Sequence, residues 1–223
     1  KQGNEFLSDF PYGISIGIHL SDSIIDQLLK YDNQEVQFEF TYHVYNIINE
    51  HLDDIAVLVT QWLQKKGYKA LPIPSRNNFN LIISNAIFSN PDDLRSAYSH
   101  KLTANLAGLG WIGKSCLLVT PEYGPRVWLA TVLTDAPLLI GKKMENRCGK
   151  CVSCIRICPA NAIKDELFNP EEDRDVRFDA VKCHQYRRGV LKQKFGFDGC
   201  GLCMAICPYG KKNPKLIKNK IKN

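Results

Sequence analysis

The sequence has no long hydrophobic run. Its 223 residues are 44% apolar, an ordinary share for a globular protein, yet no apolar stretch approaches the roughly 18 residues that a membrane-spanning helix requires. We also recognise no secretory leader. These absences exclude a membrane-spanning helix from the sequence and predict a soluble, cytoplasmic protein that makes no membrane contact.

The sequence also has little net charge outside one end. The formal net charge is +6, and the stretch from Lys211 to Lys222 holds six lysines and no acid. The rest of the chain is therefore balanced, and the basic character that nucleic-acid binding would use is confined to this tail. The plainer interpretation of the tail is a solvated segment.

Cysteine, in contrast, is abundant. The nine cysteines are an odd number, which does not suit a closed disulfide framework. The run CGKCVSCIRICP has the spacing C-x2-C-x2-C-x3-C before proline, and GCGLCMAICP repeats it as C-x2-C-x3-C before proline, which is typical of ferredoxins with two 4Fe-4S clusters. The first run contains Cys148, Cys151, Cys154 and Cys158, the second contains Cys200, Cys203 and Cys207, and Cys183 stands upstream as the eighth candidate.

Two 4Fe-4S clusters need eight thiolates, and the cysteine before each proline binds the cluster of the other run. The first cluster is therefore assigned to Cys148, Cys151, Cys154 and Cys207, and the second to Cys158, Cys183, Cys200 and Cys203. The ninth cysteine, Cys116, is predicted to be a small buried apolar residue without metal. Zinc is the alternative, because C-x2-C pairs also build tetrahedral zinc sites, but the tight spacing, the prolines and the repeat favour iron and sulfur.

The first third of the chain predicts a sheet covered by helices. Alternating isoleucines over residues 14–18 indicate a half-buried strand, and Ser21 is placed to cap a short helix. Helical apolar spacing over residues 35–66 predicts one long helix or two, with Gly67 placed to end it. Residues 69–73 are predicted to form the next strand, which two prolines confine to an edge or to irregular structure.

The stretch HKLTANLAGLGWIGKSCLLVTPEYGPRVWLATVLTD, residues 100–134, predicts a helix over residues 101–107, a glycine-rich loop, and a hairpin of strands 116–120 and 126–134. Closely spaced glycines let backbone amides approach a flat or phosphate-bearing ligand. The spacing is neither that of a Rossmann motif nor that of a P-loop. A ligand loop and a tight helix-to-strand turn both remain open.

The segments AGLGWIGKS, LLVTPEYG, LTDAPL, CGKCVSCIRICPANAI and GCGLCMAICP, taken in this order over roughly residues 104–208, resemble the epoxyqueuosine reductase family. Members of that family are cytoplasmic iron-sulfur proteins that bind cobalamin in an N-terminal α/β domain. They reduce an epoxide on a tRNA wobble base to an alkene, and they are similar in architecture to reductive dehalogenases.

The resemblance implies an α+β chain with an α/β cofactor-binding, nitroreductase-like domain over residues 1–140. A ferredoxin-like domain with two 4Fe-4S clusters over residues 141–210 and the basic tail, residues 211–223, would follow. By the same resemblance the corrinoid would contact Gly108, Gly110, Trp111, Gly113 and Lys114.

The chain departs from the family pattern at its acidic groups. Leu94 stands where the family has an acidic proton donor, and Asp92 and Asp93 lie close by. His100 and Lys101 stand where the family has an acid and an arginine, and we expect one of them to be the nearest proton donor. The helical-repeat domain that binds tRNA in longer members is not in the sequence.

The sequence thus predicts an oxidoreductase that passes electrons from two 4Fe-4S clusters to cobalamin bound in the α/β domain for reduction of a substrate. A low-potential ferredoxin or flavodoxin would supply the electrons, and tRNA is a candidate partner. The alternatives are a non-catalytic electron carrier or corrinoid-reactivating partner, and a reductase that uses flavin in place of the corrinoid.

Overall fold

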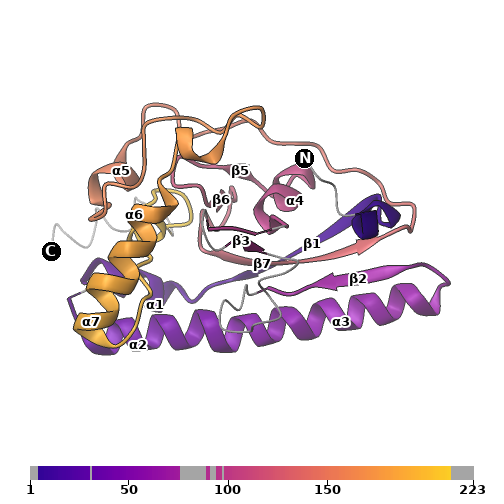
Figure 1. Cartoon of the computed structure of the whole chain (residues 1–223), viewed down its shortest axis with the longest axis horizontal. Coiled ribbons are helices and arrows are strands. Elements are labelled where there is room, and N and C mark those ends of the chain that lie inside the picture. Colours follow the sequence, from indigo (N-terminus) through magenta and orange to yellow (C-terminus); the bar gives the residue numbers. More distant parts are fainter. Residues whose placement is uncertain (1–4, 31, 76–88, 91–93, 97, 212–223) are drawn as a thin grey trace, which may run out of the picture.

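The computed structural model describes residues 5–30, 32–75, 89–90, 94–96 and 98–211 (Figure 1). The strands are β1 Tyr12–His19, β2 Ala70–Ile73, β3 Ser89–Asn90, β4 Arg95–Ser96, β5 Trp111–Ile112, β6 Leu118–Val119 and β7 Val127–Thr134. The α-helices are α1 Asp22–Gln27, α2 Gln34–Tyr42, α3 Asn49–Lys65, α4 His100–Leu106, α5 Ser153–Ile157, α6 Ala180–Gln185, α7 Lys192–Phe195 and α8 Leu202–Ala205. Short 3-10 helices are Glu5–Asp9, Leu28–Lys30 and Arg174–Val176, and π-helical turns are His43–Ile48 and Tyr186–Leu191.

The main sheet has the order β1-β7-β2, and both pairings are antiparallel. The alternating isoleucines of β1 pair with apolar residues of β7, for example Ile14 with Val132 and Ile16 with Ala130. These side chains share one face of the sheet and belong to the main apolar core. The predicted strand over residues 14–18 is therefore confirmed, and β2 lies at the sheet edge as predicted.

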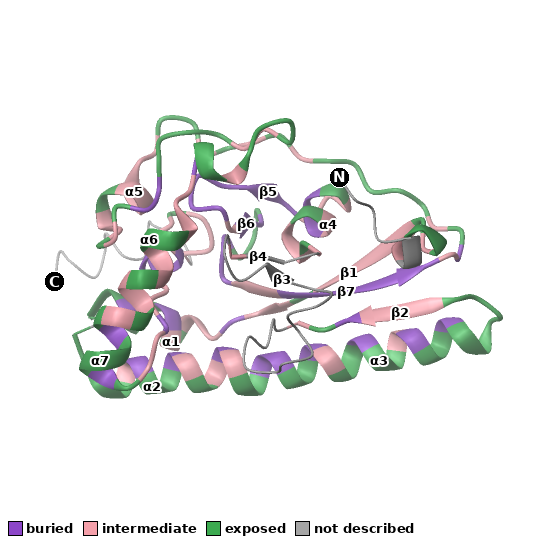
Figure 2. Ribbon diagram, viewed as in Figure 1, coloured by how far each residue is buried: buried purple, intermediate pink, exposed green. Residues whose placement is uncertain are grey.

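One long helical stretch covers that face. α2, the π-helical turn and α3 run on without a break, and α3 turns Leu52, Ala56 and Leu63 to the core while its other side is exposed (Figure 2). Gly67, with φ of +87°, follows the end of α3 in the left-handed conformation that glycine tolerates best. The helix predicted over residues 35–66 is confirmed. Among the helices of the described residues, none is both long and apolar enough to span a bilayer.

The opposite face of the sheet is covered by α4 and the glycine segment that follows it. Ala104 of α4 packs with Leu118 and Leu129 in a second apolar cluster. Because both faces of the sheet are covered, β7 is buried along most of its length. β7 is also the central strand, because it lies between β1 and β2 in the sheet.

The predicted hairpin of residues 116–120 and 126–134 is wrong. β6 pairs with β5, and β7 pairs with β1 and β2. A turn does exist, because Thr120 and Gly124 form an isolated antiparallel bridge. Beyond that bridge β7 leaves its sequence neighbour and pairs on both edges, with β1 on one side and β2 on the other.

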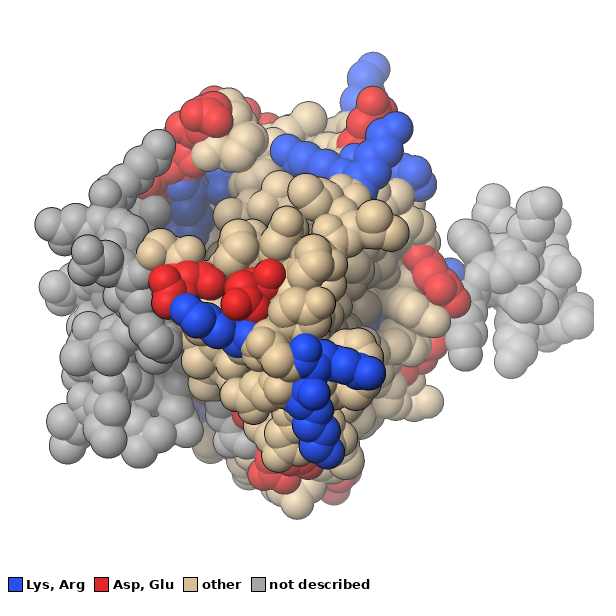
Figure 3. Space-filling model, turned by 90° about the vertical axis from the view of Figure 1, so that its right-hand side faces the viewer, with Lys and Arg blue, Asp and Glu red and all other residues tan. Residues whose placement is uncertain are grey.

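The cysteine-rich part of the chain shares a core with the rest. Met204 and Ala205 of α8 belong to the same apolar cluster as Ile25 and Leu28. Charged side chains of both signs are interspersed on the end of the molecule shown in Figure 3, as expected for a balanced body. The domain boundary at residues 140 and 141 stays a prediction, and the described structure ends at residue 211, so nearly all of the lysine tail lies outside it.

Two turns touch backbone to backbone where the cysteine-rich part meets the sheet. A Cβ at Gly124 would lie 2.0 Å from the carbonyl oxygen of Tyr209, and a Cβ at Gly210 would lie 2.1 Å from that of Tyr123. Neither position has space for a side chain. This contact fixes the segment after Cys207 against the turn that precedes β7.

Gly124→Ala is expected to lower the free energy of unfolding by more than about 2 kcal/mol, because backbone must move in addition to the left-handed strain at φ of +56°. Gly67→Ala is the matched control: its φ is also positive, but nothing lies within 4 Å of the added Cβ, so only about 1 kcal/mol should be lost. Anaerobic denaturant titrations measure both. Equal losses for the two variants would show that the contact is not tight in solution.

Candidate metal centre

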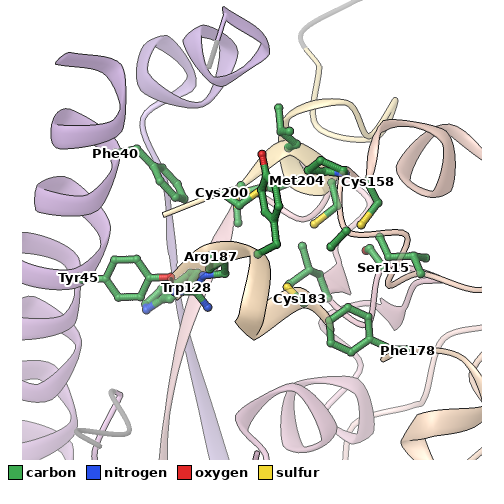
Figure 4. A pocket seen from close by; sticks show the side chains of 18 residues that line it. Phe40, Tyr45, Ser115, Trp128, Cys158, Phe178, Cys183, Arg187, Cys200 and Met204 are labelled. Carbon is green, nitrogen blue, oxygen red and sulfur yellow. Dashed lines mark hydrogen bonds between the residues drawn. The ribbon is translucent and has the colours of Figure 1, made fainter. Parts of the chain in front are cut away.

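Eight of the nine cysteines border two neighbouring cavities. The first cavity, of about 230 Å³, is lined by Cys158, Cys183, Cys200 and Cys203 (Figure 4). The second, of about 30 Å³, is lined by Cys148, Cys151, Cys154, Cys203 and Cys207. Each cavity thus gathers the four thiols that the sequence assigns to one cluster, and Cys203 borders both.

Backbone turns present the closely spaced thiols. The N–H of Cys151 donates to the carbonyl of Cys148 at 3.0 Å, and the N–H of Cys207 donates to the carbonyl of Met204 at 3.3 Å. Gly149, with φ of +50°, makes the first of these turns possible. Short spacings therefore place neighbouring thiols on one side of the chain.

Cys183, which is distant in sequence from both cysteine runs, reaches the first cavity through a different local structure. Ile163 and Phe178 form an antiparallel bridge, so the segment after Cys158 runs beside the segment before α6. Asp179 caps α6, its carboxylate accepting the N–H of Lys182 at 2.9 Å. The bridge and the cap together direct Cys183 of α6 into the cavity that Cys158 borders.

Aromatic side chains of the long helical stretch and of β7 form one wall of the first cavity. Phe40, Tyr45 and Trp128 all line it (Figure 4), and the rings of Tyr45 and Trp128 meet edge to face with centroids 5.6 Å apart. Arg187 also lines the cavity, and its Nε donates to the carbonyl of Asp198 at 2.7 Å. The thiols therefore lie in a largely apolar environment with one nearby guanidinium group.

This environment disfavours isolated thiolates. Burial, reinforced by neighbouring thiols, raises the pKa of Cys154, Cys200 and Cys207 to about 11, and it also raises the pKa of Cys203. Four thiolates on one cavity therefore need positive charge among them, which the irons of a cluster supply. The residues present fit such a group.

The arrangement differs from that of a zinc site. Zinc holds four ligands at about 2.3 Å from one centre. Within the described ranges, no three His, Cys, Asp or Glu side chains converge closely enough for a single metal ion. Thiols spread around a cavity, in contrast, suit a cluster whose thiolates bind different irons.

Lys114, a predicted corrinoid contact, lines the second cavity, and its contact with a corrinoid stays a prediction. Only 4% of the residue is exposed, and it lines that cavity together with Gly113. Its Nζ donates to the carbonyls of Gly149 at 2.8 Å and Cys151 at 3.2 Å and to Oδ1 of Asp165 at 2.5 Å. Its ammonium group is therefore fully engaged inside the protein.

The other predicted corrinoid contacts are packed tightly. A Cβ at Gly110 would lie 2.2 Å from the carbonyl oxygen of Val119, and one at Gly108 would lie 2.6 Å from that of Lys142. Trp111 is buried, and its Nε1–H has no hydrogen-bond partner in the described part of the chain. The tight-turn interpretation accounts for the glycines, while their contact with a corrinoid stays a prediction.

The predicted proton donors are also engaged internally. Nε2 of His100 is 2.9 Å from the carbonyl oxygen of Pro74, and Nδ1 is 2.9 Å from the hydroxyl of Thr131. Burial lowers the pKa of His100, which favours the neutral ring. Ser99, not His100, caps α4, since its hydroxyl accepts the N–H of Leu102.

Lys101 has a similar setting. Its Nζ donates to the carbonyl of Cys116 at 2.6 Å, and burial lowers its pKa. Leu94 has a φ of +55°, and its carbonyl accepts a hydrogen bond from Arg174. Asp92 and Asp93 lie outside the described residues. Catalytic roles for His100 and Lys101 therefore remain predictions.

Sequence reasoning missed a third cavity, of about 340 Å³, beside the glycine segment. Its lining residues are Gly17, His19, Leu109, Thr120, Pro121, Glu122, Tyr123, Val127 and Leu129. His19 stacks on Tyr123 with ring centroids 4.4 Å apart, and its Nε2 is 3.2 Å from Oδ1 of Asp22. A lone histidine at a strand end carries no motif, so only the fold reveals this setting.

Cys116→Ala is expected to leave iron and acid-labile sulfide at about eight each per chain, because Cys116 borders neither thiol cavity. Cys200→Ala is the contrasting variant and should lower both contents and bleach part of the visible absorption. Chemical analysis and spectra of anaerobically purified protein measure this. Loss of a cluster from Cys116→Ala would show that the ligand assignment is wrong.

Comparison with known proteins agrees with this geometry. Residues 147–210 match the family model of the 4Fe-4S double cluster binding domain. The epoxyqueuosine reductase of Bacillus cereus is 31% identical over 122 residues, which cover 51% of this chain and 30% of that protein. The chain thus spans about a third of the length of the curated relatives it matches.

Solved structures share the fold. An epoxyqueuosine reductase from Bacillus subtilis superposes with a TM-score of 0.52 at 22% identity, covering 74% of this chain and 39% of that one. A B12-dependent reductive dehalogenase superposes with a TM-score of 0.65 at 20% identity, covering 94% and 27%. The resemblance seen in the sequence is confirmed: the chain is similar to epoxyqueuosine reductases and carries a 4Fe-4S double cluster binding domain.

Proposed function

We propose that the chain is the electron-transferring and cofactor-binding part of an iron-sulfur reductase, with the two thiol sets holding one 4Fe-4S cluster each. The observation that carries this is the pair of adjoining thiol cavities, the first of which reaches Trp128 of the central strand. When bound, such clusters supply single electrons at low potential. A ferredoxin or flavodoxin would be the donor, in the reducing cytoplasm that unpaired cysteines favour.

A corrinoid is the proposed second cofactor, and the third cavity is its proposed binding site. Gly17 forms part of the cavity wall, and a Cβ there would meet only ordinary contacts, 3.5 Å from Leu129. Because glycine has no side chain, nothing projects from Gly17 into the cavity, which has a volume of about 340 Å³. A bound corrinoid supplies a cobalt centre that is strongly nucleophilic when fully reduced.

His19 is better placed than His100 to move a proton in this cavity. His19 lines it, whereas His100 does not. Burial of Asp22 opposes its ionisation, but the hydrogen bond and charge of Arg126, with His19, bring its pKa below the usual value. An ionised Asp22 accepts the Nε2–H of His19 and thereby holds the ring and its tautomer. The nitroreductase-like type of the sheet domain and tRNA as a candidate partner rest on resemblance, and the proposal names no substrate.

A second candidate is a non-catalytic electron carrier or corrinoid-reactivating partner. The close packing of Gly110 against Val119 favours it, because packing inside the protein already accounts for that glycine without a ligand. A flavin in place of the corrinoid is the third option. The three proposals differ in what the purified protein binds, so a binding experiment separates them.

Anaerobic protein with both clusters is titrated with cobalamin and, separately, with flavin mononucleotide, and the absorbance change is followed. Wild-type protein and Gly17→Ala should bind cobalamin, whereas Gly17→Phe should weaken binding at least tenfold by filling the cavity. His19→Ala should retain cobalamin binding and slow the reduction of a substrate. All variants should keep the cluster spectrum.

Binding of flavin but not cobalamin would replace the corrinoid proposal while leaving electron transfer intact. Binding of neither would favour the carrier. Equal cobalamin binding by Gly17→Phe and wild-type protein would show that the third cavity is not the cobalamin-binding site.

A further inference from the structure

A single buried ammonium group lies beside the second thiol cavity. Lys114 comes from the segment between β5 and β6, outside both cysteine runs, and lines the cavity of Cys148, Cys151, Cys154 and Cys207. Two of its three hydrogen bonds go to the backbone that carries the first thiols, at Gly149 and Cys151. Its charge is thereby fixed next to the cavity.

The counter-ion of Lys114 is not buried to the same degree. The side chain of Lys114 is 5% exposed, whereas that of Asp165 is 61% exposed. Solvent and salt screen an exposed carboxylate far more than a buried ammonium group. The pair therefore leaves a net positive potential on the side of the cavity, even though its formal charges cancel.

We infer that Lys114 is a positioning residue that raises the reduction potential of the cluster held by Cys148, Cys151, Cys154 and Cys207, and that Asp165 moderates this effect. The inference rests on the proposed cluster binding. One-electron reduction adds a negative charge to a cluster, so a fixed neighbouring positive charge stabilises the reduced form and a negative charge opposes it. Lys114 would act on the thiolate set through its field and through the loop that it holds.

The resemblance to epoxyqueuosine reductases would have assigned Lys114 to a corrinoid. The geometry places its charge beside the second thiol cavity, because its three hydrogen bonds go to the carbonyls of Gly149 and Cys151 and to the carboxylate of Asp165. The second thiol set has a different neighbour, Arg187, at the first cavity. The potentials of the two clusters can therefore be changed separately.

The test is a redox titration of the full chain with dithionite, followed by electron paramagnetic resonance of the reduced clusters. Lys114→Met should lower the midpoint potential of one cluster and leave that of the other unchanged. Asp165→Asn should raise the same potential by a smaller amount, and Asp165→Lys should raise it further. Opposite signs are expected because the two variants remove opposite charges.

The Asp165 variants keep the experiment decisive if Lys114→Met fails to assemble, since Asp165 is at the surface. Lys69 and Asp9 form the matched control, an exposed ion pair 3.0 Å apart at the start of β2. Lys69→Met and Asp9→Asn should move neither potential.

Absence of any cluster signal from wild-type protein would overturn the proposed function. Wild-type signals with potentials that do not respond to Asp165→Asn or Asp165→Lys would overturn this inference alone. A downward shift with every variant would also overturn it, because that result indicates general loosening of the cluster loop and not a field effect.

Discussion

The structure depends on gathering eight partly buried cysteine thiols around two adjoining cavities. Burial raises the pKa of Cys154, Cys200 and Cys207 to about 11, so these groups resist ionisation in the absence of metal. Positive charge placed among them is what makes the thiolate form stable. Folding of this part of the chain and binding of its clusters are therefore one coupled equilibrium, and the surrounding elements must assemble with it.

The remaining elements bring distant segments to the two cavities. The bridge between Ile163 and Phe178 places Cys183 beside Cys158, and the close contact of Gly124 with Tyr209 holds the segment that follows Cys207. Neither cysteine run completes a set alone, because each cavity takes thiols from both runs. The shared apolar core then ties this assembly to the sheet, through α8 and the first helices.

Local sequence patterns predicted much of this fold, but they did not predict the pairing of strands that lie far apart in the sequence. The strand over residues 14–18, the long helix, the edge strand and the grouping of thiols all follow from periodicity or spacing. The hairpin prediction failed because the partner of β7 is β1, which lies more than a hundred residues earlier in the chain. The two-residue strands β5 and β6 are too short for a periodic signal. The partner of Lys114 is fifty-one residues away, so no local motif could assign its charge to the cluster loop.

The two cavities also differ in ways that the cysteine motifs do not encode. The first is walled by Phe40, Tyr45 and Trp128, and its lining includes the guanidinium group of Arg187, which donates to the carbonyl of Asp198. The second has the ammonium group of Lys114 at its edge, which favours the extra negative charge of a reduced cluster. Identical ligand sets therefore lie in different electrostatic surroundings. The motifs specify the cysteine ligands, whereas residues from outside the cysteine runs form the rest of each cavity lining.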